Sequence, residues 1–285
     1  MCISHSRVNA HEFGFCFRAG SHLRSNRVVA KSGRNLAGYC GETIDIRAVT
    51  GELEQAAAEH GWQIEPLYTV GAVRCLALHR PVPAPRQRIY LSAGIHGDEP
   101  AGPLAALRLL RENRWPADVE LWFCPCLNPA GLQLNRRENA SGIDLNRDYK
   151  QPDSTEVRAH VAWLQRLPRL DLTICLHEDW EAQGAYLYEL NPDRLPSPAA
   201  AILAAIARVC PIDPSAEIDG RPTQGGLIRP NFDPALRKQW PEAFWLLQYK
   251  SRLSYTLEAP SDFPMAVRVE ALTVAVTTIV TGVDL

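Results

Sequence analysis

The sequence lacks an excess of positive charge, and it lacks an apolar run long enough to cross a membrane. Its 285 residues carry a formal net charge of −2 and a pI near 6.5, so there is no basic surplus to neutralise nucleic-acid phosphates. A membrane span needs about 18 consecutive apolar residues, and no uninterrupted apolar run is that long. We therefore expect no nucleic-acid partner and no membrane, and a cytoplasmic location.

The sequence also lacks any Cys-x-x-Cys pair. Eight cysteines are scattered along the chain, and the closest two, Cys124 and Cys126, flank a proline in an apolar, strand-like run. That spacing is not typical of a zinc-cysteine cluster or a redox motif. In a reducing compartment such residues behave as small buried hydrophobes. We predict free, mostly buried thiols and no disulfide framework.

Residues 1–40 lack the periodicity that marks a helix or a strand. They mix Arg, Ser, Asn, Gly and His without a sustained pattern. We predict an irregular or poorly ordered N-terminal segment, with upstream sequence that precedes the true start as the alternative. Apolar residues make up 46% of the chain and charged residues 22%, which is ordinary for a globular protein. Residues 41–285 are therefore expected to form one folded domain.

From Thr50 onward, apolar runs alternate with amphipathic segments. The runs predict strands over 62–70, 73–78, 88–93, 119–124, 170–176, 185–190 and 252–258. The segments between them predict helices over 51–60, 99–112, 159–167, 198–209 and 264–280. This alternation favours an α/β fold, a single doubly wound domain. Its central sheet should be mixed but mostly parallel, with helices on both faces.

His96 and Glu99 follow the end of the predicted strand 88–93 and open a helix. Ligand sites of open α/β sheets gather beyond the carboxyl ends of strands. Two histidines and one glutamate are a known ligand set for catalytic zinc. The alternative is a helix N-terminus at which Asp98 and Glu99 favour the positive end of the helix.

His177 follows the strongly apolar strand 170–176 and is the candidate third ligand. Glu178 or Asp179 could orient it from behind, as acidic groups do for ligand histidines. The alternative is a core histidine that is hydrogen-bonded to a neighbour. The six remaining histidines lie in the N-terminal segment, in predicted helices or at surface-like positions.

A loop rich in arginine and asparagine follows strand 119–124, at the same expected edge of the sheet. It begins at Asn128 and contains Arg137, Asn146 and Arg147. A guanidinium can bind a carboxylate through two parallel hydrogen bonds. The loop therefore predicts an anion site over the metal, with a solvated polar loop as the alternative.

These motifs together resemble the zinc carboxypeptidase superfamily. HGDE, NPAG, RENASGIDLNRDY, a histidine that closes a strand, and TLEAP occur in that order over roughly residues 88–262. The resemblance implies one zinc ion per chain, bound by His96, Glu99 and His177. The short spacing from NPAG to DLNR is similar to that of compact bacterial murein-peptide amidases.

The same resemblance implies roles for four further residues. Arg137 would polarise the scissile carbonyl and stabilise the oxyanion, while Asn146 and Arg147 would hold the terminal carboxylate of the substrate. Glu258 would be the general base and then the general acid. Its position at the end of strand 252–258 should bring it to the same rim as the metal. The digestive members have a tyrosine on a loop before this base, and residues 219–240 contain none.

We therefore expect a zinc-dependent hydrolase that cleaves an amide bond next to a free carboxylate in a small peptide or an acyl-amino acid. The nearest alternative is an N-acyl-amino-acid deacylase similar to succinylglutamate desuccinylases and aspartoacylases, which share the HxxE…His site and the late glutamate. The RxNxxGxDLNR segment favours the peptidase. A non-catalytic metal- or peptide-binding module is a further alternative, but every ligand and the base are present.

Overall fold

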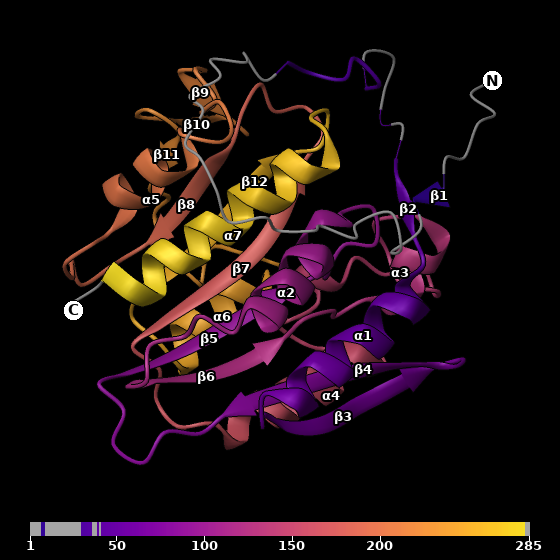
Figure 1. Cartoon of the computed structure of the whole chain (residues 1–285). Coiled ribbons are helices and arrows are strands. Elements are labelled where there is room, and N and C mark those ends of the chain that lie inside the picture. The colour runs from indigo at the N-terminus through magenta and orange to yellow at the C-terminus, as the bar shows by residue number, and fades with distance from the viewer. Residues whose placement is uncertain (1–6, 9–29, 36–38, 40, 283–285) are drawn as a thin grey trace, which may run out of the picture.

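The computed structural model describes residues 7–8, 30–35, 39 and 41–282. Most of the predicted irregular segment 1–40 thus lies outside the described residues. An eight-stranded sheet in the order β11-β8-β12-β7-β5-β6-β4-β3 runs through the centre of the molecule (Figure 1). Its strands are β3 (Gln63–Val70), β4 (Val73–Arg80), β5 (Gln87–Ala93), β6 (Val119–Cys124), β7 (Leu172–Asp179), β8 (Tyr186–Leu190), β11 (Leu227–Ile228) and β12 (Ser254–Pro260).

The middle of this sheet is parallel and its flanks are antiparallel. Strands β12, β7, β5 and β6 run in one direction. Strand β8 is antiparallel to β12, and β4 is antiparallel to both β6 and β3. Two small pairs lie outside the sheet: β1 (Arg7–Val8) with β2 (Thr43–Ile44), and β9 (Glu217–Ile218) with β10 (Arg221–Pro222). The predicted mixed, mostly parallel sheet is confirmed.

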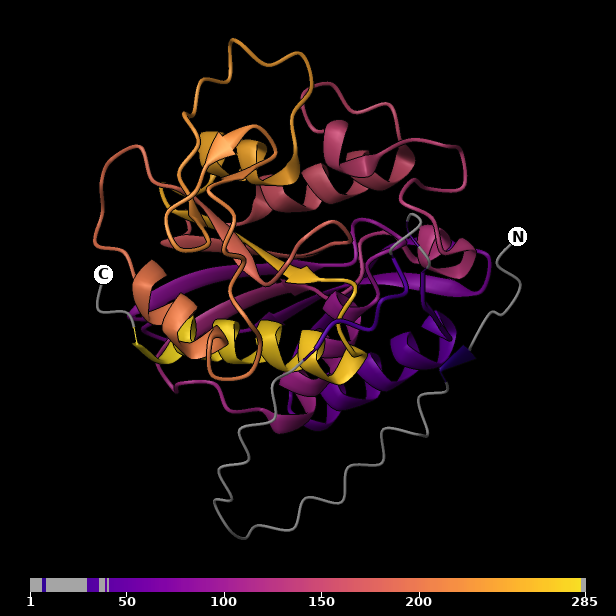
Figure 2. The same cartoon turned by 90° about the horizontal axis from the view of Figure 1, so that it is seen from above.

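Helices cover both faces of the sheet, as predicted (Figures 1 and 2). One face carries α1 (Ile46–Glu59), α2 (Ala101–Glu112), α5 (Ala199–Ile206) and α7 (Met265–Gly282). The other face carries α4 (Thr155–Arg166) and α6 (Glu242–Tyr249). Short helical turns α3 (Pro129–Leu134) and η2 (Leu145–Arg147) interrupt the long loop after β6.

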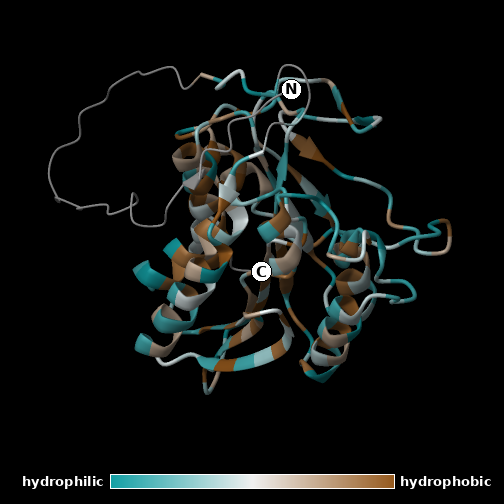
Figure 3. Cartoon of the chain, turned by 90° about the vertical axis from the view of Figure 1, so that its right-hand side faces the viewer, coloured by the Kyte–Doolittle hydropathy of each residue, from teal (hydrophilic) through white to brown (hydrophobic). Residues whose placement is uncertain are grey.

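Burial on both faces explains the continuous apolar runs of the central strands. Strand β5 is buried at every position except Arg88, and Ile89, Tyr90 and Leu91 are each at most 1% exposed. Figure 3 shows hydrophobic residues along the strands between the helix layers and hydrophilic residues on the outer turns of the helices. A parallel strand between two helix layers has no polar face, so it shows no alternation in sequence.

Helix starts differ from the predictions where a polar side chain caps the helix. Helix α1 begins before the predicted residue 51, because the Asp45 carboxylate accepts a hydrogen bond from the Ala48 amide, at 3.1 Å. Helix α3 lies where a loop was predicted, and the Asn128 side chain caps it by accepting from Gly131 N–H, at 2.8 Å. Helix α6 is short and was not predicted.

Two functional strands extend further than predicted. Strand β7 continues to Asp179 and β12 to Pro260, so His177 and Glu258 lie within strands rather than at their ends. By length and composition, α7 is the one helix among the described residues that could cross a membrane. It packs against α2, α5 and β12 and buries Arg268, so it is a core helix here.

The thiol prediction is confirmed for the five described cysteines, Cys75, Cys124, Cys126, Cys175 and Cys210. Each is buried and free. Burial raises the pKa of Cys75 to about 12 and that of Cys210 to about 11, which is typical of inert structural thiols.

The buried His160 gives the fold a measurable acid sensitivity. Its imidazole contacts the Tyr90 hydroxyl at 2.9 Å and the Tyr149 hydroxyl at 2.7 Å. Burial lowers the pKa of His160 to about 3, whereas an unfolded histidine has a pKa near about 6.5. Between those pH values the unfolded chain binds one more proton, so stability from this group is lost as pH falls.

We expect His160 to lower the free energy of unfolding by up to about 1.4 kcal/mol per pH unit between about pH 6 and 4. Urea titrations across this range should show a shallower pH dependence for His160→Gln than for the wild type. The exposed His60→Gln serves as the control. Equal slopes for wild type and His160→Gln would contradict this assignment.

Candidate metal centre and active-site pocket

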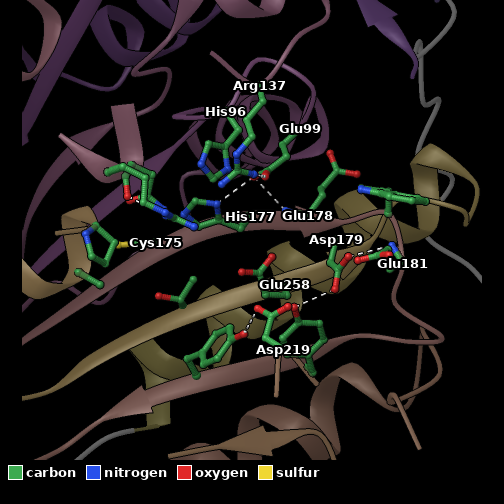
Figure 4. Close-up of a pocket in the computed structure, with 18 of the residues that line it drawn as sticks. His96, Glu99, Arg137, Cys175, His177, Glu178, Asp179, Glu181, Asp219 and Glu258 are labelled. Carbon is green, nitrogen blue, oxygen red and sulfur yellow. Dashed lines mark hydrogen bonds and ion pairs between the residues drawn. The ribbon is translucent and has the colours of Figure 1, made fainter. Parts of the chain in front are cut away.

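Three buried side chains converge beyond the carboxyl ends of the central strands. Glu99 Oε1 lies 2.5 Å from His96 Nδ1, and Glu99 Oε2 lies 2.9 Å from His177 Nδ1. One ligand atom from each residue falls within 4.8 Å of the other two. Figure 4 shows the three side chains pointing toward one another. Two imidazole nitrogens and a carboxylate are a donor set that suits zinc.

Each of these side chains comes from a different part of the sheet edge. His96 lies three residues after β5, Glu99 lies just before α2, and His177 lies in β7, which pairs with β5. The parallel pairing of β5 and β7 brings their carboxyl ends together, so residues distant in sequence meet there. A metal fits the residues present at this edge.

Charge stabilises the carboxylate form of Glu99. Burial alone would raise the pKa of Glu99, but His96 and His177 hold that pKa well below its usual range. Burial alone would lower the pKa of His96, but the Glu99 and Asp144 carboxylates outweigh it and raise that pKa. The site thus favours an anionic glutamate between two imidazoles, which is the ionisation of the carboxylate that a cation requires.

Asp144 links the metal centre to Arg137. Its Oδ2 accepts a hydrogen bond from Arg137 Nε at 2.8 Å, and its Oδ1 lies 3.4 Å from His96 Nε2. Arg137 Nη1 lies 3.8 Å from Glu99 Oε1. Asp144 therefore orients the guanidinium of Arg137 and places a negative charge near the imidazole of His96. The sequence motif contained Asp144, but its role was not predicted.

Glu258 stands beside His177 because of strand register. Strand β12 lies between β7 and β8, and Glu258 pairs with His177 on one side and with Tyr186 on the other. Partners in register project toward the same face of the sheet. Desolvation raises the pKa of Glu258 well above its usual range, with His177 opposing and Glu99 reinforcing that shift. A buried carboxyl with a raised pKa beside a candidate metal site is a candidate acid–base catalyst.

The three ligand candidates and Glu258 line a pocket of about 400 Å³ that has a basic wall. Asn146 and Arg147 belong to this wall, and the loop before α6 adds Arg237. The Asn146 Oδ1 accepts a hydrogen bond from Glu242 N–H at 2.9 Å, so its NH₂ group is the donor that the pocket can use. Arg237 stacks on Phe244, with 4.6 Å from its guanidinium carbon to the ring centroid.

Arg221 extends the same wall. Its guanidinium carbon lies 5.8 Å from the ring centroid of Tyr188, and it makes a long, 4.0 Å ion pair with Asp219. Burial, followed by the positive charges of Arg221 and Arg147, lowers the pKa of Arg237. Three guanidinium groups thus act on the same part of the pocket, which favours an anionic ligand. Arg221 and Arg237 were missed in the sequence, because residues 219–240 match no motif.

Acidic side chains also line the pocket. Asp179 accepts a hydrogen bond from the Tyr186 hydroxyl, and Asp219 accepts one from the Tyr188 hydroxyl, at 2.9 and 2.7 Å. Burial raises the pKa of Asp179 above its usual range. Figure 4 shows Asp219 on the side of Glu258 that faces away from Arg137, and Asp179 beside Glu258. The pocket therefore holds both acidic and basic side chains, and Arg221 and Asp219 are neighbours in it.

Comparison with known proteins supports a hydrolase of this kind. Residues 85–214 match the family described as succinylglutamate desuccinylase/aspartoacylase catalytic domain. Carboxypeptidase SOL1 of Arabidopsis thaliana is 32% identical over 110 residues, which are 29% of this chain and 21% of that protein. Murein peptide amidase A of Escherichia coli is 34% identical over 98 residues, or 33% of this chain and 39% of that protein. The chain thus matches less than half the length of these curated relatives.

A solved structure extends the likeness to most of the fold. A candidate metallopeptidase from Shewanella amazonensis has a TM-score of 0.72 and 25% identity, and the match covers 83% of this chain and 92% of that one. Together these findings confirm the resemblance to the zinc carboxypeptidase superfamily that the motifs indicated. Its relatives are hydrolases of the carboxypeptidase and amidase group.

The convergence of three ligand candidates predicts one bound metal ion per chain. We expect elemental analysis of the purified full-length protein to find about one zinc equivalent. Loss of a residue that only supports a metal ligand typically weakens metal binding by about 10–100-fold. His177→Ala removes a ligand itself, so it should weaken zinc binding by more than that. His79→Ala, which removes an imidazole stacked on Trp122 in a different part of the sheet, should retain the metal. Equal zinc affinity in both variants would refute the site.

Proposed function

We propose that this chain, a relative of the zinc carboxypeptidase superfamily, is a zinc-dependent hydrolase that cleaves an amide bond next to a free carboxylate. The observation that carries the proposal is the shared pocket of the His96, Glu99 and His177 cluster. Glu258 lies in register with that cluster, and a basic wall lies beside it. A metal, a general base and an anion site are the three parts that such a reaction needs.

Zinc, when bound by these three residues, supplies a Lewis acid that makes a water molecule nucleophilic near neutral pH. The Glu258 carboxylate accepts the proton of the attacking water and later donates it to the nitrogen of the leaving amine. Arg137 donates hydrogen bonds to the carbonyl oxygen as negative charge develops there. A donor of this kind typically contributes about 3–4 kcal/mol to transition-state stabilisation.

The basic wall would fix the register of the substrate. The terminal carboxylate accepts hydrogen bonds from the Arg147 guanidinium and the Asn146 amide, which Glu242 holds in place. Arg237 adds positive charge from the loop before α6. Anchoring the carboxylate brings the adjacent amide carbonyl toward Arg137 and Glu258, so the reaction becomes effectively intramolecular.

Glu258→Gln should lower kcat/KM for a short peptide by about 100-fold or more, because a neutral amide cannot accept the proton of water. Zinc content should stay at the wild-type level, since Glu258 is not among the ligand candidates. The exposed Glu65→Gln, in β3, is the control. Wild-type turnover in Glu258→Gln would remove this residue from the mechanism.

Arg147→Gln should raise KM by about 10–100-fold, the usual cost of losing a charge-assisted hydrogen bond. We expect a smaller change in kcat, because the carboxylate is bound in both the ground state and the transition state. Steady-state kinetics on a peptide and on its C-terminal amide would measure this, and the variant should discriminate less between the two. Arg166→Gln, an exposed arginine of α4, is the control. An unchanged KM in Arg147→Gln would place the carboxylate elsewhere.

The match to the succinylglutamate desuccinylase/aspartoacylase family supports a second candidate, an N-acyl-amino-acid deacylase. Both reactions hydrolyse an amide beside a carboxylate, so the same pocket serves either. Assays of the zinc-loaded protein on acyl-amino acids and on short peptides distinguish the two. We expect faster hydrolysis of peptides, and exclusive cleavage of acyl-amino acids would reverse that order.

A further inference from the structure

Glu178 is a buried carboxylate that the proposed reaction does not use. It follows His177 in β7, and its side chain has 0% exposure. Its Oε1 accepts a hydrogen bond from Ala101 N–H at 2.6 Å, and its Oε2 pairs with Arg268 Nη1 at 2.5 Å. A buried carboxylate is costly unless it is paired and hydrogen-bonded. Its position beside the metal centre therefore needs an explanation.

The contacts of Glu178 constrain Glu99. Helix α2 begins at Ala101, two residues after Glu99, and its first amides have no partner within the helix. The Glu178 side chain binds one of them, which joins β7 to the start of α2. In addition, the backbone N–H of Glu178 donates to Glu99 Oε2 at 3.1 Å. Side chain and backbone of one residue thus fix both the segment that carries Glu99 and the Glu99 carboxylate itself.

Arg268 supplies the charge that this arrangement requires. It comes from α7, its side chain is 2% exposed, and it also contacts Glu42, which in turn pairs with Arg34 at 2.5 Å. Glu178 and Glu99 are neighbouring buried carboxylates. Without a nearby cation their negative charges would repel each other. Arg268 pairs with Glu178, so Glu178 faces α7, while Glu99 contacts the two histidines. The two carboxylates therefore have different surroundings: Glu99 faces the proposed metal site, and Glu178 faces Arg268.

We infer that Glu178 and Arg268 are a positioning pair for the metal centre: they hold the Glu99 carboxylate between His96 and His177 before the metal binds. The inference rests on the proposed metal site. Residues that hold a metal-binding side chain in place raise the affinity for the metal, because the side chain then moves little when the metal binds. The pair reaches residues 34 and 42, upstream of the segment that matches the known family. The matched catalytic region is therefore stabilised by residues on both sides of it.

The test measures zinc affinity of the full-length protein by competition with a chromophoric chelator. Glu178→Gln keeps the shape of the side chain but removes its charge, and should weaken zinc binding by about 10–100-fold. Arg268→Lys, which preserves the charge, should weaken it less than Arg268→Met. Thermal unfolding of the metal-free variants, measured in parallel, reports any general loss of stability.

Glu189→Gln is the matched control. Glu189 is also a buried glutamate paired with an arginine, Arg229, at 3.1 Å, but it lies outside the pocket that holds the metal centre. Lower unfolding temperatures in both glutamine variants, with wild-type zinc affinity in Glu178→Gln, would mean a purely structural role and would overturn the inference. If Glu178→Gln does not fold, Glu42→Gln at the more exposed end of the pair should weaken zinc binding several-fold. Wild-type affinity in Glu42→Gln and Arg268→Met would then overturn the inference.

Two further results distinguish this inference from the proposed function. Weaker zinc binding in Glu178→Gln, with a wild-type protein that hydrolyses neither peptides nor acyl-amino acids, would support the positioning pair and refute the hydrolase. Hydrolysis by the wild type, with equal zinc affinity in wild type and Glu178→Gln, would support the hydrolase and refute the positioning pair. A wild-type protein that binds no metal would refute both.

Discussion

The arrangement of one carboxylate between two imidazoles constrains the rest of this molecule. Glu99 contacts His96 and His177 through separate oxygens, and all three side chains are at most 6% exposed. Polar groups buried to this degree are stable only when their partners are fixed. The contacts among these three side chains therefore join the segment after β5, the start of α2 and strand β7. The fold positions a small polar cluster inside an apolar frame.

The pairing of the strands also determines which side chains line the pocket beside this cluster. Register sets His177, Glu258 and Tyr186 in a row across three strands, while the loop after β6 contributes Arg137, Asp144, Asn146 and Arg147. The pocket thus brings acidic and basic side chains together around the metal centre. The field of such side chains orients a charged ligand.

Much of this site could be predicted from the sequence because its parts are local. His96, Glu99 and His177 follow apolar runs, and an apolar run locates the end of a buried strand. The contacts between Glu178 and Arg268 could not be predicted, since 90 positions separate the two residues and neither belongs to a periodic pattern. Arg221 and Arg237 were missed for a similar reason: their loop has no motif, and only the folded chain brings it over the pocket. Helices α3 and α6 were not predicted, because their six and eight residues are too few to establish a 3.6-residue period.

Part of the pocket comes from residues outside the segment that matches the known family. That match ends at residue 214, before Arg221, Arg237, helix α6 and Glu258. The matched part contains the three candidate metal ligands, Arg137, Asn146 and Arg147. The remaining part adds Arg221, Arg237 and Glu258 to the pocket, and Arg237 stacks on Phe244 there. Because specificity arises from the groups that contact the variable part of a substrate, Arg221 and Arg237 in this C-terminal quarter are candidates, together with Asn146 and Arg147, for the residues that decide between the two reactions.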